Sequence, residues 1–323
     1  MKAILQKQED RLKVNYSLVP PFPREVFLDV TNFCNHECFF CSNTEMRKKA
    51  MIDPMLAKRL LREAREYGST DVGLYATGEP FLYPHLEAVL REAKNLGFKY
   101  VFLTTNGSLC TPENVKRILD AGLDSIKFSI NAGTRRSYKR VHGKDDFEKV
   151  INNVKWCYQY KVDTGMEYGI YVSMVKTKQT ENEDKLLKEI LLPYVEDFQV
   201  RGCSNQGGNK IENNVSEIIQ KGNLLGSLRS GQMVGVCCPD IFGRATITPE
   251  GYLSACVVDY QNYLIVADLN KCTLKEAWES EVYKDLRRRH LDAELDGIIC
   301  NCCLNNIQTD VYPLNEKYAK AFT

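Results

Sequence analysis

Three closely spaced cysteines are the residues of this chain best suited to chemistry. Cys34, Cys38 and Cys41 lie in the segment Thr31-Asn-Phe-Cys-Asn-His-Glu-Cys-Phe-Phe-Cys41, directly after the apolar run Val26-Phe-Leu-Asp-Val30. Three thiolates on one short loop can bind three irons of a [4Fe–4S] cluster, whereas a fourth would complete its ligand set. The spacing therefore predicts a cluster with one open iron, at which a substrate or cosubstrate can bind.

The Cys-x3-Cys-x2-Cys spacing resembles that of the radical S-adenosylmethionine (SAM) superfamily. In that family the open iron binds the amino and carboxylate groups of SAM. The reduced cluster cleaves SAM to methionine and a 5′-deoxyadenosyl radical, which takes a hydrogen atom from the substrate. The resemblance implies that Phe40, the aromatic residue before the last cysteine, lies in the SAM site. The alternative is a zinc site made from Cys34, His36, Cys38 and Cys41, in a non-catalytic binding protein.

Composition narrows the class of protein further. The 323 residues carry a formal net charge of +1, and the short basic run Arg287–His290 predicts a solvated helix face, so we expect no nucleic-acid partner. No apolar run is long enough to cross a bilayer, which predicts a cytoplasmic protein without membrane attachment. The 13 cysteines are odd in number and gather mainly in two groups, which favours metal binding over a disulfide framework.

Apolar and amphipathic segments alternate between residues 24 and 200, which predicts repeated βα units and hence an α/β fold. The predicted strands are Glu25–Thr31, Asp71–Ala76, Tyr100–Thr105, Ser125–Ile130, Glu167–Val175 and Asp197–Arg201. The predicted helices are Pro54–Tyr67, His85–Leu96, Pro112–Ala121, Asp145–Tyr160 and Asn182–Tyr194. The pattern suits an open sheet or a barrel, and the radical SAM resemblance implies a partial (β/α)6 barrel. Catalytic groups then belong at the carboxyl ends of the strands.

We expect four regions along the chain. Residues 1–23 are an N-terminal extension, residues 24–205 the partial barrel, residues 206–235 a linker or substrate-covering segment, and residues 236–323 a second cysteine-bearing module. The extension is short and polar and has no visible peptide-recognition domain. This lowers the expectation of a peptide substrate.

The segment Ala76-Thr-Gly-Glu-Pro80 follows the second predicted strand. It resembles the Gly-Gly-Glu motif of radical SAM proteins, with Thr77 in place of the first glycine, and this implies that it binds the SAM amino group. The residue types agree, because Gly78 permits close backbone approach and Glu79 supplies negative charge for an ammonium group. An ordinary βα turn is the alternative.

Polar residues after the third, fourth and fifth predicted strands are further candidates for the SAM site. They are Asn106, Ser129, Asn131, Arg140 and Ser173. Ser129 and Asn131 resemble the positions that contact the SAM carboxylate or ribose. Arg140 suits a bidentate pair with that carboxylate, unless it belongs to the exposed side of a basic run. Ser173 ends a segment that resembles the one packed against adenine, although alternating core residues explain most of that segment without a ligand.

A second cysteine group lies near the C-terminus. The runs Ala245–Thr248 and Tyr252–Ala255 predict a β-hairpin, and a helix is predicted at Leu274–Arg289. This order resembles the SPASM/twitch family of radical SAM enzymes in its shortened twitch form. The resemblance implies one auxiliary [4Fe–4S] cluster, whose ligands would be Cys238, Cys256, Cys300 and Cys303. Cys237 is adjacent to Cys238, and Cys302 is adjacent to Cys303. Either could replace its neighbour as a ligand. A structural zinc ribbon is the alternative.

The frame resembles twitch aminocyclitol dehydrogenases and radical SAM enzymes of glycan gene clusters. It implies a radical SAM oxidoreductase acting on a small carbohydrate-like molecule. The expected reaction oxidises a secondary alcohol of a sugar, nucleotide sugar or aminocyclitol, with the auxiliary cluster as electron acceptor. An electron donor such as flavodoxin or ferredoxin would reduce the enzyme.

Two other reactions remain open. In an epimerase, the thiol of Cys203 after the sixth predicted strand would return a hydrogen atom to the opposite face of the substrate. A lone cysteine is more often a small buried apolar residue. Arg201 and Asn205 are candidate substrate contacts that suit a phosphate or a sugar hydroxyl. A peptide-modifying SPASM-type enzyme is the further alternative.

Overall fold

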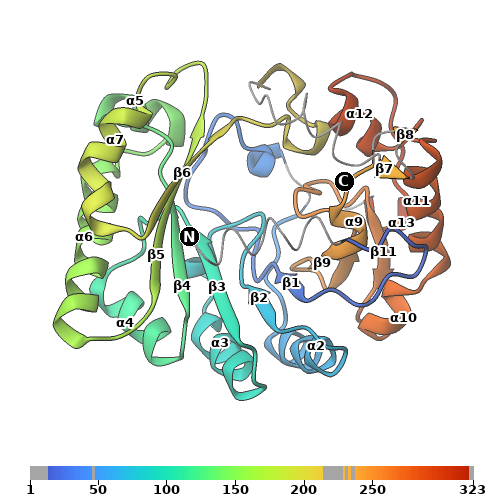
Figure 1. Cartoon of the computed structure of the whole chain (residues 1–323), viewed down its shortest axis with the longest axis horizontal. Coiled ribbons are helices and arrows are strands. Elements are labelled where there is room, and N and C mark those ends of the chain that lie inside the picture. Colours follow the sequence, from blue (N-terminus) through green and yellow to red (C-terminus); the bar gives the residue numbers. More distant parts are fainter. Residues whose placement is uncertain (1–13, 46–47, 214–227, 230–231, 234–236, 320–323) are drawn as a thin grey trace.

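The computed structural model describes residues 14–45, 48–213, 228–229, 232–233 and 237–319. Its main feature is one curved, nine-stranded sheet in the order β11-β10-β9-β1-β2-β3-β4-β5-β6 (Figure 1). The edge strands β6 and β11 do not pair with each other, so the sheet is an open, incomplete barrel. This arrangement confirms the predicted α/β fold class.

Strands β1 to β6 run parallel and form the larger part of the sheet. Their bounds are β1 Glu25–Leu28, β2 Asp71–Gly73, β3 Tyr100–Thr105, β4 Ser125–Ser129, β5 Gly169–Lys176 and β6 Asp197–Gly202. Alternate side chains point outward, and those of Val26 and Leu28 are fully buried. The six predicted strands are confirmed. Each was predicted from apolar residues that a strand can pack against the outer helices.

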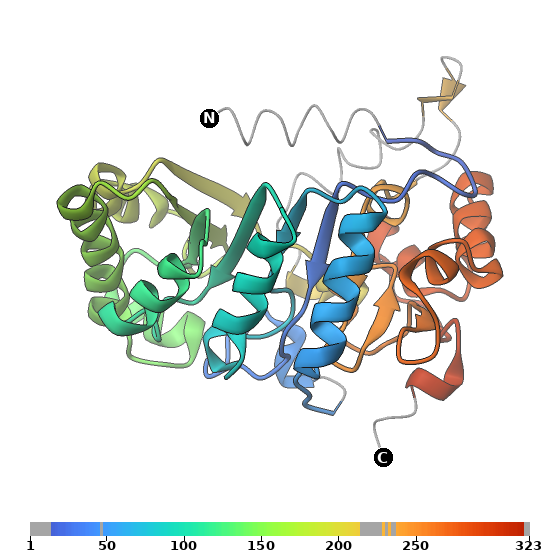
Figure 2. The same ribbon diagram turned by 90° about the horizontal axis from the view of Figure 1, so that it is seen from below.

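Helices cover the outer face of the parallel strands (Figure 2). They are α2 Pro54–Glu66, α3 Leu86–Asn95, α4 Pro112–Asp120, α6 Phe147–Thr164 and α7 Asp184–Leu191. An additional helix, α5 (Arg135–His142), was not predicted. The basic sequence of α5 hides the apolar pattern by which helices were predicted. The Thr134 side chain caps the start of this helix by accepting a hydrogen bond from the Ser137 N–H.

The C-terminal strands are β9 Ala245–Ile247, β10 Tyr252–Ser254 and β11 Ile265–Asp268. Strands β9 and β10 form the predicted antiparallel hairpin. Because β9 also pairs in parallel with β1, the hairpin extends the main sheet. The helices of this region are α9 Asp240–Gly243, α10 Leu274–Trp278, α11 Glu281–Asp292, α12 Ile299–Asn305 and α13 Glu316–Ala319. The prediction of one helix over 274–289 is wrong, because the Ser280 side chain caps a new helix by accepting from the Tyr283 N–H.

Short turns of 3-10 helix and one small strand pair complete the described chain. They are η1 Ser42–Glu45, η2 Pro80–Leu82, η3 Leu192–Tyr194, η4 Gln206–Gly208 and η5 Ile211–Asn213, with β7 Leu228–Arg229 and β8 Gln232–Met233. Most of the predicted covering segment, 206–235, lies outside the described residues. The interpretation of this segment as a linker or substrate cover therefore stays a prediction.

Arg287 corrects the expectation of a solvated basic face on α11. Its side chain is fully buried, and so is that of His290. The guanidinium lies over the rings of Trp278 and Tyr283, at 4.2 and 3.7 Å from their centroids, and donates to the carbonyl oxygens of Trp278 and Leu18, both at 2.9 Å. A buried cation is tolerated here because aromatic faces and carbonyls surround it. The contact ties the chain near residue 18 to the C-terminal helices.

The inner face of the sheet is polar and partly exposed. Side chains on neighbouring strands line up in rows because their backbones are in register. One row is Thr104, Lys127, Tyr171 and Asp197, and the next toward the carboxyl ends is Ser129, Ser173 and Gln199. All seven are partly exposed, in contrast to the buried residues on the outer face. The inner face can therefore contact a polar molecule.

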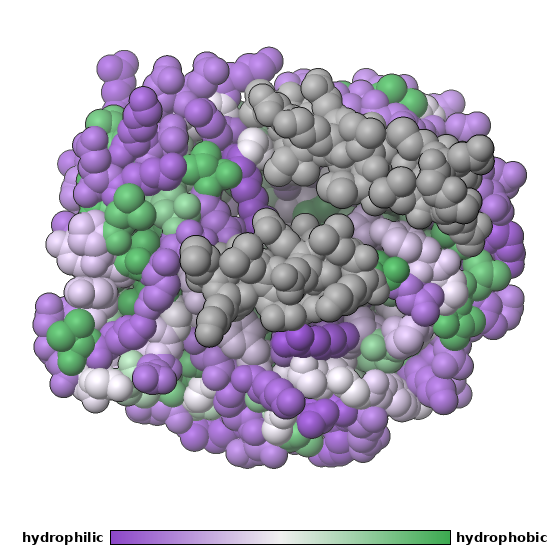
Figure 3. Space-filling view, viewed as in Figure 1, coloured by the Kyte–Doolittle hydropathy of each residue, from purple (hydrophilic) through white to green (hydrophobic). Residues whose placement is uncertain are grey.

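The surface of the described residues mixes apolar and polar side chains. On the face in Figure 3, hydrophobic residues occur in small groups among hydrophilic ones. Large exposed apolar side chains, such as Met55, Val162 and Leu192, are far apart in the sequence. Scattered exposure of this kind is normal for a folded domain. None of the described helices combines the length and apolar character needed to cross a bilayer.

The loops after β1 and β2 touch through their backbones. The Glu79 N–H donates to the carbonyl oxygen of Phe33 at 2.8 Å. A Cβ atom at Gly78 would lie 2.2 Å from the Thr31 carbonyl oxygen and 2.5 Å from that of Phe33. Only glycine fits this contact, and the obstacles are backbone atoms that cannot rotate away.

Gly78→Ala is expected to destabilise the fold by roughly 3 kcal/mol or more, because it overpacks a site lined by backbone. The measurement is the free energy of unfolding from urea denaturation. Gly243→Ala is the matched control, since a Cβ there meets its nearest atom, in Val14, at an ordinary 3.4 Å. Equal losses for the two variants would contradict the packing argument.

Candidate active site

The first cysteine group occupies the loop between β1 and η1, at the carboxyl end of β1. Cys34, Cys38 and Cys41 are free thiols. Burial, with smaller contributions from Glu79 and Cys41, raises the pKa of Cys34 to about 11. Burial also raises the pKa of Cys38, as do Cys41 and Cys34. The three sulfurs are thus close enough to act on one another electrostatically, as one metal site requires.

Each sulfur of this group is approached by a nitrogen that can donate a hydrogen bond. The Asn43 N–H donates to the last sulfur at 3.4 Å, Asn106 Nδ2 lies 4.0 Å from the first, and His142 Nδ1 lies 3.5 Å from the second. Donors suit thiolates, whereas burial disfavours free thiolates. A bound cationic metal group removes that conflict. The residues therefore fit the predicted iron–sulfur cluster.

Glu79 lies buried at the base of the second loop. Its carboxylate accepts hydrogen bonds from Thr105 Oγ1 and the Asn106 N–H, both at 2.8 Å, and from the Phe81 N–H at 3.2 Å. Burial raises the pKa of Glu79 to about 7, although these donors act in the opposite direction. The three donors fix the carboxylate in place, which suits recognition of an ammonium group.

Thr77 has a contact that the first glycine of the resembled motif could not make. Its hydroxyl donates to Asp29 Oδ2, and its N–H donates to the same oxygen at 3.1 Å. The Thr77 carbonyl accepts from Asn43 Nδ2. The threonine therefore joins the loop after β2 to the end of β1 and to the cysteine loop.

The candidates on β4 and β5 divide into two sets. Ser129 and Ser173 are register partners on the inner face, so the structure brings them together. Asn131 is buried, and its Oδ1 accepts from the Val175 N–H at 2.8 Å, which braces β4 against β5. Arg140 lies on the exposed side of α5 and donates to the Gln179 carbonyl at 3.2 Å. That position favours the surface interpretation of Arg140.

The second cysteine group gathers from three elements. Cys238 precedes α9, Cys256 follows β10, and Cys300 and Cys303 lie on α12. Burial raises the pKa of Cys256, and Cys303, Cys238 and Cys300 raise it further. Burial raises the pKa of Cys300 as well, followed by Cys238 and Cys303. Four thiols that act on one another match the complete ligand set of a [4Fe–4S] cluster.

Cys237 and Cys302 lie close to the four proposed ligands. Cys237 packs in the main hydrophobic core, as Cys300 does, and the Cys302 sulfur lies 3.9 Å from the carbonyl oxygen of Thr309. The Cys238 N–H donates to His290 Nδ1 at 3.4 Å, so the ring proton belongs on His290 Nε2. That nitrogen is buried and has no partner among the described residues. An unpartnered buried donor on the ring that contacts the Cys238 backbone is available to a bound acceptor.

Tyr260 lies between the two cysteine groups and Asn205 lies beside the second, and sequence patterns did not identify either role. The Tyr260 hydroxyl donates to Gln206 Oε1 at 3.0 Å and lies 3.7 Å from Cys41 Sγ. Burial raises its pKa, and Cys41 and Cys256 contribute from either side. Asn205 Nδ2 donates to the Cys303 carbonyl at 2.8 Å. Asn205 is fully buried, so it supports α12 and does not face substrate as expected.

Cys203 and Arg201 differ in exposure. Cys203 is 1% exposed and packs with Phe40 and Val141 beside the first cysteine loop. Burial raises the pKa of Cys203 to about 11, and Cys41 adds to the shift, so the thiol keeps its proton. Arg201 is exposed at the end of β6, and its Nη2 donates to Gln199 Oε1 at 2.8 Å.

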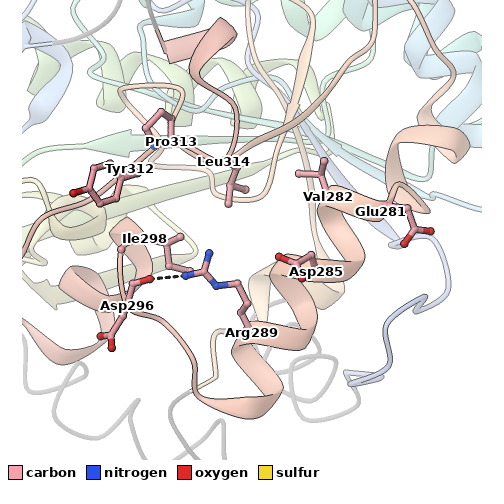
Figure 4. A pocket seen from close by; sticks show the side chains of 10 residues that line it. Glu281, Val282, Asp285, Arg289, Asp296, Ile298, Tyr312, Pro313 and Leu314 are labelled. Atoms are coloured by element: carbon pink, nitrogen blue, oxygen red, sulfur yellow. Dashed lines mark hydrogen bonds between the residues drawn. The ribbon is translucent and has the colours of Figure 1, made fainter.

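A separate hollow of about 520 Å³ lies between α11 and the chain around residues 296–298 and 312–314 (Figure 4). Arg289 crosses it and donates to the Asp296 carbonyl oxygen. Its lining contains Tyr312 and Leu314 but no cysteine and none of the predicted site residues. The chemistry suggested by the cysteines therefore belongs elsewhere.

Comparison with known families agrees with the two cysteine groups. A family model described as the radical SAM superfamily matches residues 28–190. A second model, described as an iron–sulfur cluster-binding domain (SPASM), matches residues 237–304. The first range includes the cysteine loop and the loops after β2 to β5, and the second includes Cys238, Cys256, Cys300 and Cys303.

Similar proteins of known name include probable GTP 3′,8-cyclases. The protein from Saccharolobus islandicus (strain M.14.25) is 27% identical over 294 residues, which are 81% of this chain and 90% of that protein. The protein from Saccharolobus solfataricus is 35% identical over 132 residues, 40% of this chain and 41% of that protein.

Solved structures share the fold. Streptococcus suis SuiB bound to S-adenosylmethionine has a TM-score of 0.65 at 17% identity, over 87% of this chain and 71% of that chain. BtrN in complex with AdoMet and 2-DOIA has a TM-score of 0.56 at 15% identity, over 87% and 92%. A radical SAM domain followed by a SPASM domain implies SAM and two [4Fe–4S] clusters, which leaves no support for the zinc alternatives. This chain belongs to the radical SAM superfamily.

Proposed function

We propose that this radical SAM enzyme oxidises a secondary alcohol of a sugar, nucleotide sugar or aminocyclitol. The observation that carries the proposal is the mutual influence of Cys238, Cys256, Cys300 and Cys303. A cluster with four thiolate ligands has no open iron for a substrate. It suits electron transfer, and oxidation is a reaction that needs an electron acceptor.

When bound, SAM and the first cluster would supply a 5′-deoxyadenosyl radical able to take a hydrogen atom from the alcohol carbon, and the auxiliary cluster would accept the electron that the substrate then loses. Loss of the hydroxyl proton to a base completes the conversion to a ketone, two hydrogens lighter than the alcohol. Cys34, Cys38 and Cys41 are the proposed ligands of the SAM-binding cluster. The four C-terminal cysteines are the proposed ligands of the auxiliary cluster.

The loops after β2 to β5 are the proposed SAM site. Glu79 is fixed by three donors and would accept hydrogen bonds from the SAM ammonium group. Gly78 keeps the motif in backbone contact with the cysteine loop. Phe40, Thr77, Asn106 and Asn131 hold these loops in place, and Ser129 and Ser173 offer hydroxyl groups on the inner face. Arg140 stays a proposal of lower rank because its guanidinium is exposed.

The substrate is proposed to lie against the inner face of the sheet. Lys127 lies near the centre of that face, with its Nζ 5.8 Å from the centroid of the Tyr75 ring, and no ion pair joins it to another described residue. Arg201 adds a second cation at the end of β6. Two cations and an aromatic ring suit a polar substrate with an anionic group, such as the phosphate of a nucleotide sugar.

A GTP cyclase is the second candidate. It is favoured by the 27% identity to a probable GTP 3′,8-cyclase that covers 81% of this chain. The same cations would suit a triphosphate. A peptide substrate has the weaker support of fold similarity to SuiB bound to the precursor peptide SuiA, and an epimerase would depend on Cys203.

The cluster count tests both cysteine assignments. Protein purified without oxygen is expected to contain about eight irons and about eight acid-labile sulfides per chain, as two four-iron clusters require. Cys34→Ala and Cys256→Ala are each expected to leave about four of each. Cys157→Ala changes a buried cysteine of α6 and is expected to retain all eight. Loss of both clusters in that control would show that folding, and not ligation, governs the count.

Glu79→Gln is expected to weaken SAM binding by about 10- to 100-fold, because a charge-assisted hydrogen bond contributes roughly 1.5–3 kcal/mol. Equilibrium dialysis with labelled SAM on cluster-loaded protein measures the effect. Glu87→Gln on α3 is the control, since Glu87 pairs with the surface arginines Arg91 and Arg117. Unchanged SAM affinity in Glu79→Gln would remove this residue from the SAM site.

The products separate the candidate reactions. With SAM, a reductant and a panel of nucleotide sugars, aminocyclitols, peptides and GTP, the expected product is a ketone of a sugar or aminocyclitol, measured by mass spectrometry. Cys256→Ala should abolish the ketone and retain 5′-deoxyadenosine release, whereas Cys203→Ala should retain both. An isobaric product that takes up deuterium from D₂O and is lost in Cys203→Ala would establish an epimerase. If GTP were the only compound of the panel consumed, the GTP cyclase hypothesis would be supported instead.

A further inference from the structure

His142 is the last residue of α5 and lies beside the first cysteine group. It is fully buried. The Tyr138 ring stacks on its imidazole, with centroids 4.0 Å apart and planes 13° apart. The Asn131 N–H donates to His142 Nε2 at 3.1 Å. These contacts fix the ring on both its face and its edge.

The position of the His142 proton follows from these contacts. A backbone N–H can only donate, so His142 Nε2 must present its lone pair to Asn131. An imidazole with a lone pair on Nε2 is neutral and carries its single proton on Nδ1.

Two acceptors face that proton. Cys38 Sγ lies 3.5 Å from His142 Nδ1, and His36 Nδ1 lies 3.3 Å from it. His36 Nε2 lies 3.1 Å from Asp146 Oδ2. Because a carboxylate accepts, the His36 proton belongs on Nε2, which leaves His36 Nδ1 as an acceptor. The His142 Nδ1–H is thus shared between His36 and the Cys38 sulfur.

The proton position excludes a separate metal site at these residues. His36, Cys38 and His142 offer ligand atoms within 4.8 Å of one another, a spacing that would suit a metal ion. A protonated Nδ1 cannot ligate, and moving the proton to Nε2 would oppose the Asn131 N–H. The arrangement is that of a hydrogen-bond donor aimed at sulfur.

We propose that His142 sets the reduction potential of the first cluster by donating its Nδ1–H to the iron-bound sulfur of Cys38. The inference depends on the proposed role of Cys38 as a ligand and not on the substrate. Reduction adds negative charge, which spreads onto the cluster sulfurs, and a donor to sulfur stabilises the reduced form. His142 acts through Cys38 and is a positioning residue. His36, oriented by Asp146, competes for the same proton and weakens the donation to sulfur.

The two histidines are therefore expected to act in opposite directions. His142→Phe keeps a ring stacked on Tyr138 but removes the donor. The equilibrium constant for reduction should fall by about tenfold, as expected for a hydrogen bond to a charged group. His36→Phe removes the competing acceptor, so the constant should stay equal or rise. A purely structural contribution of this cluster of rings would lower the constant in both variants.

The measurement is an electrochemical titration of cluster-loaded protein followed by EPR spectroscopy, with the first cluster identified by the change that SAM makes in its signal. Iron and sulfide contents equal to those of the unmodified protein establish loading. His85→Gln, on the exposed residue before α3, is the control and should not shift the potential. A loaded His142→Phe variant with an unchanged potential would overturn the proposal.

A second outcome keeps the test decisive if His142→Phe does not retain its cluster. His36→Phe alone then decides, because a fall in its reduction constant contradicts competition for the proton. The result of this potential measurement is also independent of the test of the proposed alcohol oxidation. Failure to oxidise a secondary alcohol would leave the potential shift intact. The ligand role on which the shift depends requires that Cys38→Ala lose about four irons and the SAM-sensitive EPR signal.

Discussion

The parallel pairing of β1 with both β2 and β9 is the interaction on which the rest of this structure depends. It places a strand near residue 25 beside one near residue 71 and one near residue 245. The Asp29 N–H continues the contact by donating to the Ile247 carbonyl at 2.9 Å. Because β1 leads into the first cysteine loop and β9 lies between Cys238 and Cys256, the same pairing brings two distant cysteine groups to one part of the molecule.

Backbone contacts then fix the first loop with little freedom. Gly78 meets the carbonyls of Thr31 and Phe33, and Thr77 holds the Asp29 carboxylate. Backbone atoms cannot change rotamer, so the loop after β2 acts as a rigid support for the cysteines. The departure from a double glycine at Thr77 has a physical reason, since a hydroxyl at that position reaches β1.

The burial of the cysteine sulfurs explains why both groups require a bound cation. Burial raises the thiol pKa values, yet a nitrogen donor approaches each of the first three sulfurs. In the second group, the buried His290 Nε2 has no partner among the described residues, and the ring accepts from the Cys238 N–H. Donors favour thiolates, and thiolates in a low dielectric require cations. Cys41 of the first group and Cys256 of the second both raise the pKa of Tyr260. The electrostatics of the two sites are therefore linked.

The sequence by itself determined the features that depend on neighbours along the chain: the six parallel strands, the hairpin and the closely spaced cysteines of the Cys34–Cys41 loop. The alternation of apolar residues and the spacing of neighbouring cysteines are local properties, so both can be recognised without a structure. Only the tertiary structure decided that Arg287 is buried, that Asn205 supports α12, that Ser280 divides a helix, and that His142 reaches Cys38 across 104 residues. Those outcomes depend on which distant surfaces meet, and a residue's type and local pattern carry no information about a partner that the fold brings from elsewhere.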